Sequence, residues 1–182
     1  MCHFFREGFR EGLFMTAPWE SRNKKVEHGM EQNGESRQQI IQEYKKTVEP
    51  LMRYLPWLEK NTGRAVSRNY QGQGLSKSSM SFPVYDGTLI NFVKEAAASS
   101  LMNRNYAYVY TRNRIRSHED ERRLIAAAEW KDWDILAGIL SKYVLEGQRK
   151  ANLWGEAVRE DIFVLVMKKM RQIIEYWDKA GK

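Results

Sequence analysis

The residues best equipped to hold a charged ligand are gathered between Arg104 and Arg116. This stretch contains four arginines and three tyrosines, and no acidic residue interrupts it. In an extended strand alternate residues point to the same side, so the even-numbered tyrosines and arginines would share one face. Guanidinium groups neutralise phosphates while aromatic rings stack on bases, and proteins commonly hold single-stranded nucleic acid in this way. The pattern predicts a site for nucleic acid or another polyanion that comprises Arg104, Tyr106, Tyr110, Arg112, Arg114 and Arg116.

A helical conformation of the same stretch leads to a different interpretation. On a helix neighbours recur every three or four residues, so Tyr106, Tyr110 and Arg114 no longer align with the other members. The tyrosines would then pack between helices. The arginines would pair with the acidic run Glu119-Asp120-Glu121, which follows directly. The sequence leaves both interpretations open.

A second candidate for anion binding is the loop Gly72-Gln73-Gly74-Leu75-Ser76-Lys77-Ser78. Glycine lets a backbone approach an anion closely, and Lys77 adds a positive charge. The loop lacks the four residues that separate the first glycine from the Gly-Lys pair in a Walker motif. A solvated connection explains the same composition. Lys77 is nevertheless kept as a candidate anion-binding residue.

Metal chemistry finds little support in the sequence. The chain has three histidines, His3, His28 and His118, and their spacing matches no zinc site. Cys2 is the single cysteine, which excludes an intrachain disulfide and a cluster of thiolate ligands. We therefore expect no metal ion and no cofactor.

Two groups of residues offer a weaker case for an enzyme. Asp132 and Asp134, with Glu129, could surround a divalent ion, although caps of a helix explain them more simply. His118 beside Glu119 could act as a general base, or it could be the first turn of a capped helix. The sequence contains no nucleophile elbow of the Gly-x-Ser-x-Gly type.

Composition and charge narrow the class of protein. Thirty Lys and Arg residues oppose 23 Asp and Glu, which gives a net charge of +7. This excess is compatible with an anionic partner and equally with an ordinary basic surface. No apolar run approaches the roughly 20 residues that cross a bilayer, so no membrane partner is expected. The single cysteine favours a reducing, cytoplasmic location.

The hydrophobic spacing predicts a compact, mainly α domain with several helices over residues 36–182. Residues 1–35 read as a flexible N-terminal extension, because glycines interrupt their short apolar face. A small β-hairpin near residues 64–86 is a further expectation, with Val66–Tyr70 and Ser81–Tyr85 as its strands. No alternation of strands and helices appears, so a doubly wound α/β fold is not expected.

Helix boundaries can be placed from particular residues. Pro50 and Pro56 predict either a kink or two shorter helices. Asp86 predicts an N-cap, and Ser117 with Asp120 predicts a capping box. Gly147 predicts a left-handed end to the helix that contains Ile135–Val144. The final helix is predicted from one apolar stripe that consists of Phe163, Val166, Met170, Ile173 and Trp177.

Several short patterns occur together in the second half of the chain. They include Asp134-Ile135-Leu136, the segment Ile139–Val144 with Gly147, and Leu153-Trp154. Ser81–Asp86 and Tyr108-Val109-Tyr110 add to them. The chain resembles an uncharacterised bacterial family, domain of unknown function 6508, over about residues 38–178. The resemblance implies a bacterial cytoplasmic protein and no mechanism or catalytic residues.

Two functions follow as alternatives. The leading one is a binding or interaction module for nucleic acid or another acidic partner. It requires Tyr106, Arg112, Arg114 and Arg116 to be exposed on one basic surface. The other is an enzyme whose pocket is built from distant residues, and it requires carboxylates such as Asp86 or Asp132 to converge with a base. The sequence leaves enzymatic activity and oligomeric state undecided.

Overall fold

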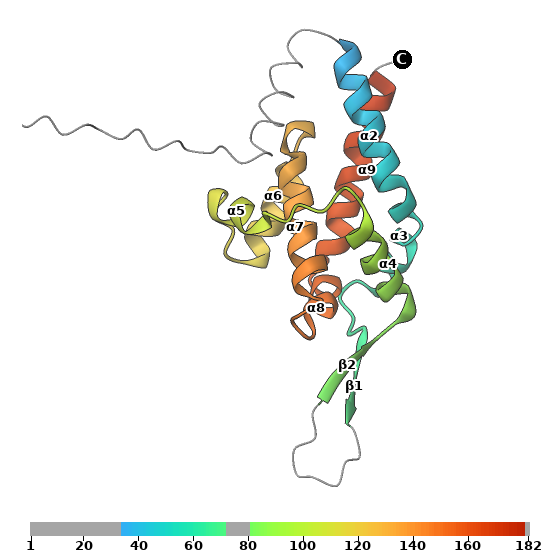
Figure 1. Cartoon of the computed structure of the whole chain (residues 1–182), viewed down its shortest axis with the longest axis vertical. Coiled ribbons are helices and arrows are strands. Elements are labelled where there is room, and N and C mark those ends of the chain that lie inside the picture. Colours follow the sequence, from blue (N-terminus) through green and yellow to red (C-terminus); the bar gives the residue numbers. More distant parts are fainter. Residues whose placement is uncertain (1–33, 72–80, 181–182) are drawn as a thin grey trace, which may run out of the picture. The chain divides into compact units, whose positions relative to one another are not determined.

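A computed structural model describes residues 34–71 and 81–180, so Lys77 and the glycine-containing loop around it lie outside the described residues. In the described part the protein has a mainly α fold, as predicted (Figure 1). Its helices are α2 (Gly34–Met52), α3 (Leu55–Asn61), α4 (Gly87–Ala98), α5 (Tyr106–Arg112), α6 (His118–Ala127), the short 3-10 helix η1 (Trp130–Asp132), α7 (Trp133–Glu146), α8 (Leu153–Arg159) and α9 (Ile162–Ala180).

Gln38–Lys182 forms one compact unit. Helix α2 begins at Gly34, two residues before the predicted domain boundary at Ser36. The predicted extension, residues 1–35, lies almost wholly outside the described residues, and its flexibility stays a prediction.

The chain forms two helices here, α2 and α3, which is one of the two outcomes that the prolines predicted. Pro50 lies in the last turn of α2, and Pro56 is the second residue of α3. A proline is tolerated in the first turn of a helix because no intrahelical partner awaits its missing N–H. The backbone N–H of Tyr54 bonds to the carbonyl of Leu51 at the junction, at 3.1 Å.

Polar side chains begin two of the helices as expected. Asp86 accepts a hydrogen bond of 2.7 Å from the backbone N–H of Thr88 and so caps α4. Ser117 and Asp120 form a capping box at the start of α6. Each satisfies donors that the first turn of a helix leaves unpaired. The capping box fixes where His118 enters the helix, which matters for the site below.

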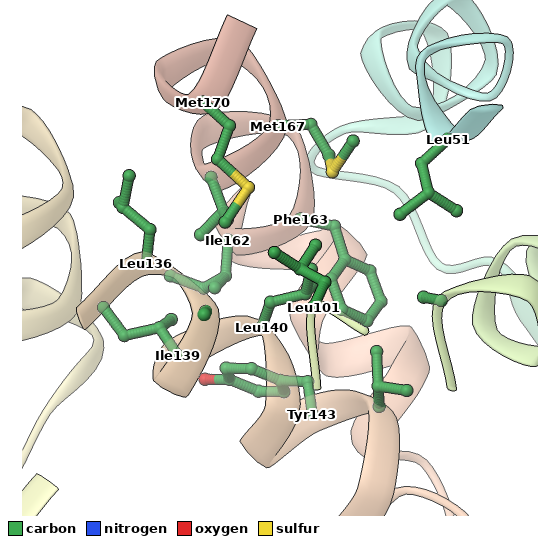
Figure 2. Packing of buried hydrophobic residues seen from close by; sticks show 14 of the residues in the cluster. Leu51, Leu101, Leu136, Ile139, Leu140, Tyr143, Ile162, Phe163, Met167 and Met170 are labelled. Carbon is green, nitrogen blue, oxygen red and sulfur yellow. The ribbon is translucent and has the colours of Figure 1, made fainter. Parts of the chain in front are cut away.

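Helix α7 lies at the centre of the hydrophobic core. Its residues from Ile135 to Ser141 are all buried, as are Tyr143 and Val144, so the helix is covered nearly all round. Helix α9 packs against it with the predicted stripe, of which only Trp177 is partly exposed. Figure 2 shows the ring of Phe163 of α9 near that of Tyr143 of α7, and the ring centres lie 6.0 Å apart. In Figure 2 the oxygen of Tyr143 points away from Phe163. This hydroxyl donates a hydrogen bond to Glu121.

Helices α2 and α9 run side by side (Figure 1). The ammonium group of Lys45 lies 3.2 Å from a carboxylate oxygen of Asp178 and joins the two helices. Both helices span 19 residues but carry many charges. None of the helices in the described ranges is long and apolar enough for a membrane crossing.

Gly147 ends α7, but the prediction of a left-handed residue there is wrong. Its φ is −62°, an ordinary helical value. A Cβ at this position would lie 2.0 Å from the indole nitrogen of Trp154. Gly147 is therefore needed for space, because the Trp154 ring occupies the volume that a side chain would take.

The predicted hairpin is confirmed. Strand β1 (Ser67–Gln71) pairs antiparallel with β2 (Ser81–Tyr85), and Asn69 lies opposite Pro83. Both members of a two-stranded sheet are edge strands, which can accept a proline. The Tyr85 ring lies 5.3 Å from the Trp154 ring, so the hairpin is anchored on α8.

Candidate functional site

The predicted basic stretch contains a helix and not an extended strand. Residues Tyr106–Arg112 form α5, so the expectation that alternate side chains share one face is wrong. The helix packs mainly on α7, and the two run in opposite directions. Arg112 at the end of α5 meets Asp134 in the first turn of α7, and Tyr110 meets Lys142 further along.

Gly138 allows α5 to approach α7 closely. A Cβ added to Gly138 would lie 2.8 Å from a methyl group of Val109 and 3.0 Å from its Cβ. Val109 is itself buried, at 3% exposure. This contact fixes the position of α5 and hence of the polar residues on both of its sides.

Two of the candidate tyrosines lie on the side of α5 that faces the domain. Tyr110 is partly buried, and its hydroxyl donates to Glu121 at 2.5 Å. Burial, and next the charge of Glu121, raise the pKa of Tyr110 far above its ordinary value. Tyr106 is also partly exposed, and burial together with a hydrogen bond to Glu146 raises its pKa. The Tyr110 ring is therefore not available as an open stacking platform.

The candidate arginines are all exposed. Arg112 is paired with Asp134 at 2.9 Å, and its guanidinium lies 5.9 Å from the centre of the Tyr108 ring. Arg104, Arg114 and Arg116 are exposed, and within the described residues none of them forms an ion pair. The predicted pairing with the acidic run Glu119-Asp120-Glu121 does not involve these side chains. Those carboxylates pair instead with Arg122, Arg123 and Lys142.

Arg114 occupies a position that favours glycine. Its φ is +54°, in the left-handed region. The N–H of Ile115 bonds to the carbonyl of Tyr110 at 2.9 Å, and the N–H of Arg114 bonds to that of Thr111 at 3.2 Å. These two bonds form a Schellman motif, which ends many helices and usually has glycine where Arg114 stands. A side chain there costs about 1 kcal/mol or more.

A buried carboxylate joins α5, α6 and α7. Glu121 is 1% exposed, yet both of its oxygens have partners. Oε1 accepts from the Tyr110 hydroxyl at 2.5 Å and from the Lys142 ammonium at 3.0 Å. Oε2 accepts from the Tyr143 hydroxyl at 2.7 Å and lies 3.2 Å from Nδ1 of His118. With these bonds the carboxylate is fully satisfied, which a buried charge requires.

The electrostatics of Glu121 follow from these contacts. Burial alone would raise its pKa, but the hydrogen bonds from Tyr110 and Tyr143 and the charge of Lys142 outweigh burial and lower it. Burial, and then the charge of Glu121, raise the pKa of Tyr143 strongly. Lys142 also lies over two aromatic rings, 4.6 Å from the centre of Tyr110 and 4.8 Å from that of Tyr143. Glu121 is thus an ionised structural residue. Both of its oxygens already accept hydrogen bonds, so it is poorly suited to act as a base.

His118 connects this cluster to α8. It is the first residue of α6, as the capped-helix interpretation predicted, and its side chain is 32% exposed. Its Nε2 lies 3.0 Å from Oε1 of Glu156. The acidic partners of His118 are therefore Glu121 and Glu156, and not the adjacent Glu119, which pairs with Arg122.

The carboxylates expected to build an enzyme pocket do not converge. Asp86 caps α4, and Asp132 accepts from the backbone N–H of Glu129 at 3.0 Å. Asp134 pairs with Arg112. Among the described residues no three His, Cys, Asp or Glu side chains are grouped as a metal site.

One surface cavity of about 370 Å³ is found elsewhere. It is open to solvent and lined by Glu129, Trp130, Lys169, Gln172, Ile173, Tyr176 and Trp177. None of the candidate residues from the sequence lines it except Glu129. The ammonium group of Lys169 is held by the carbonyl of Ala126 at 2.8 Å.

The sequence interpretation missed the cluster around Glu121. A signal was present, since helical spacing puts Glu121 on the same face as Ile125 and Ala128, which are both buried. A carboxylate on a buried apolar stripe needs a hydrogen-bond donor. The hydroxyl of Tyr143, on the apolar face of α7, is such a donor. What the sequence could not give was the crossing of α5, α6 and α7 that brings them together.

No family model, curated protein or solved structure matches the chain. Membership of domain of unknown function 6508 therefore stays a prediction from the residues quoted above.

Proposed function

We propose that the domain binds a phosphate-rich polyanion, with nucleic acid as the expected ligand class, through Arg104, Arg114 and Arg116. The observation that carries this proposal is the exposure of these three guanidinium groups without an ion pair among the described residues. Arg104 precedes α5 by two residues, while Arg114 and Arg116 follow it. A seven-residue helix is about 10 Å long, so the charges flank a short, continuous stretch of surface.

Many other arginines of the domain behave differently, although Arg64 and Arg149 are likewise exposed and form no ion pair among the described residues. Six of them in the described residues form ion pairs with carboxylates, and these are Arg53, Arg112, Arg122, Arg123, Arg159 and Arg171. Exposed ion pairs contribute little stability, but they do neutralise the charge that a ligand would otherwise meet. The arginines that flank α5 keep their full charge for an external anion.

The backbone at Arg114 supports the same interpretation. Glycine would fit its left-handed conformation without strain, yet the chain carries a long cationic side chain there. Residues in sparsely populated backbone conformations are often found at sites that bind ligands. The Schellman motif directs this charge outward at the end of α5.

The expected mode of binding is contact with phosphates and not with bases. Tyr106 and Tyr110 face the domain, so the stacking of bases on both rings is not part of the proposal. Contacts with phosphates carry no sequence information, and they make affinity strongly dependent on salt. A nucleic-acid ligand also agrees with the cytoplasmic location that the single cysteine favours.

The test is a salt titration of binding to single-stranded DNA, double-stranded DNA and RNA of mixed sequence. Affinity should fall steeply as salt rises. The triple variant Arg104→Gln, Arg114→Gln, Arg116→Gln should flatten the slope of log K against log salt by about 2 to 3 for duplex DNA. The matched control replaces Arg53, Arg159 and Arg171 with Gln, which removes the same three charges from arginines that are already paired.

The two triple variants distinguish the effect of charge at the proposed site from the effect of the net charge of the protein. If both weaken binding equally, the net charge of +7 is responsible and the three arginines form no site. Absence of binding at low salt to all three nucleic acids would refute the proposal for nucleic acid. The order of affinities among the three ligands then shows which form the surface prefers.

A further inference from the structure

We propose that the cavity lined by η1 and α9 binds a small planar aromatic acid, with the ring of the ligand against three aromatic side chains and its carboxylate on Lys169. The inference shares no residue with the arginines around α5 and is independent of polyanion binding. It starts from the cavity of about 370 Å³ described above. A hollow of this size, with aromatic walls and a few polar groups, is typical of sites for small molecules.

The walls of the cavity are held in place by the fold. On α9 the residues Lys169, Ile173 and Trp177 are spaced four apart and so lie on one face of the helix. Ile173 is buried behind this face, at 6% exposure. The ammonium group of Lys169 donates to the carbonyl of Ala126 at 2.8 Å and ties α9 to the last turn of α6. Trp130 of η1 supplies the other wall.

The three aromatic rings of the cavity meet nearly at right angles. The Trp177 ring makes an angle of 81° with the Trp130 ring and 86° with the Tyr176 ring, and the ring centres are 6.1 Å and 5.2 Å apart. A flat ring that stacks on Trp177 is therefore edge-on to the other two. Offset-stacked and edge-to-face contacts are the arrangements that aromatic pairs prefer. The lining thus favours a planar aromatic ring over an aliphatic one.

Tyr176 provides apolar surface for a ligand to cover. Its side chain is 65% exposed, the largest fraction among the exposed large hydrophobic residues in the described ranges. A ring bound beside it removes apolar surface from water on both partners, which is favourable. Because the side chain contributes little to the core, it can also be replaced without loss of the fold.

The charges at the cavity favour an anion. Within the described residues the ammonium group of Lys169 bonds to a neutral carbonyl and forms no ion pair. An ammonium group has three N–H donors, so two remain for a ligand. Glu129 is the one acidic residue of the lining, and Lys131 neutralises it at 3.1 Å. The charge left without a counterion is that of Lys169, and a carboxylate beside the rings would supply it.

Four matched ligands test this chemistry on the full chain. They are benzoate, benzamide, cyclohexanecarboxylate and benzylammonium, titrated at constant ionic strength and followed by the amide chemical shifts of the protein. Benzoate should bind about tenfold more tightly than benzamide, because only the acid can pair with Lys169. It should also bind more tightly than cyclohexanecarboxylate, which has the charge without the flat ring. The shift changes should be confined to η1 and the second half of α9.

Substitutions at two neighbouring lysines locate the anion. Lys169→Met keeps the apolar stem and should weaken benzoate binding about tenfold while leaving benzamide binding unchanged. Unchanged benzamide binding also shows that the cavity is intact. Lys168→Met removes the same charge from a residue that is paired with Glu59 at 3.0 Å, and it should bind benzoate as the parent does. Tyr176→Ala should weaken benzoate and benzamide alike.

The arginine variant of the preceding section keeps the two proposals apart. Arg104→Gln, Arg114→Gln, Arg116→Gln should bind benzoate like the parent, whether or not the parent binds nucleic acid. Equal effects of Lys169→Met and Lys168→Met, or tighter binding of benzylammonium than of benzoate, would overturn the assignment of an anion. Equal affinities for benzoate and cyclohexanecarboxylate would overturn that of an aromatic ring. No shift change with benzoate at millimolar concentration would overturn the site itself.

Discussion

The hydroxyl of Tyr110 donates a 2.5 Å hydrogen bond to Oε1 of Glu121, across the turn that separates α5 from α6. The bond is short, as is typical when the acceptor is ionised. It ties the outermost helix of the candidate site to the buried carboxylate. Tyr110 therefore has a structural contact between helices, which is what the helical interpretation of the sequence predicted, and it does not have the stacking role of the extended interpretation.

Removing this hydroxyl should destabilise the protein. We expect Tyr110→Phe to lower the free energy of unfolding by about 1.5–3 kcal/mol, because a buried charge loses one donor. Urea denaturation followed by circular dichroism measures the change. Tyr176→Phe, in which the side chain is 65% exposed, is the control and should change stability little. Equal effects of the two substitutions would contradict the role assigned to Tyr110.

Because of Glu121, the stability of the fold should decrease as pH falls into the acidic range. Its pKa is lower in the folded state than the ordinary value of 4.5, so the folded state binds fewer protons than the unfolded chain. The stabilisation is present above about pH 4.5 and is lost as pH falls through the lower folded value. Thermal unfolding between about pH 3 and pH 7 should therefore show a shallower acid dependence for Glu121→Gln than for the parent.

The same variant should be less stable at neutral pH, by about 2–4 kcal/mol, since Lys142 is left without its buried partner. Glu119→Gln is the matched control, because this side chain is 86% exposed. It should leave the acid dependence unchanged. A parent and a Glu121→Gln variant with parallel pH profiles would show that Glu121 does not have a depressed pKa.

Arg114→Gly should raise the stability of the fold and lower its affinity for a polyanion. Glycine relieves the left-handed backbone and should stabilise the fold by up to about 1 kcal/mol. It also removes one of the exposed charges and should weaken polyanion binding. Arg114→Gln removes the same charge but keeps the strain, so it should weaken binding equally without a gain in stability. A variant Arg114→Gly that binds as well as the parent would exclude this side chain from the site.

Gly138→Ala tests the close approach of α5 and α7. The added methyl group would collide with Val109, and we expect a loss of about 1–3 kcal/mol. Val109→Ala creates space at the same contact, so the double variant should be less destabilised than the sum of the single variants. Gly87→Ala is the control, because nothing lies within 4 Å of a Cβ at that position. Strictly additive effects of Gly138→Ala and Val109→Ala would show that the two residues do not touch.

Much of the fold could be predicted because its signals are local. The positions of the prolines predicted a boundary between α2 and α3, and the capping residues predicted where α4 and α6 begin. The stretch around α5 was harder, because the spacing of its tyrosines fits a strand as well as a helix. In the fold the stretch is helical, and Val109 packs against Gly138, a long-range contact that cannot be read from the local spacing.

The candidate site was predictable only in part for the same reason. Exposed arginines could be named from the sequence, but whether each finds a carboxylate depends on elements far apart in the chain. Asp134, which pairs with Arg112, is 22 residues away. Gly147 shows a related limit, since its role is to leave room for the Trp154 ring and not to adopt a special backbone angle.

The tight contact between Gly138 and Val109 has a consequence for how a ligand would bind. It holds the backbone of α5 in its final position before any ligand arrives, so association requires no folding step. The remaining cost is the ordering of a few guanidinium side chains, at about 0.5–1.5 kcal/mol each. A preorganised, positively charged surface of this kind captures its partner at a rate set by electrostatic steering. Added salt should consequently lower the association rate constant of a polyanion far more than it raises the dissociation rate constant.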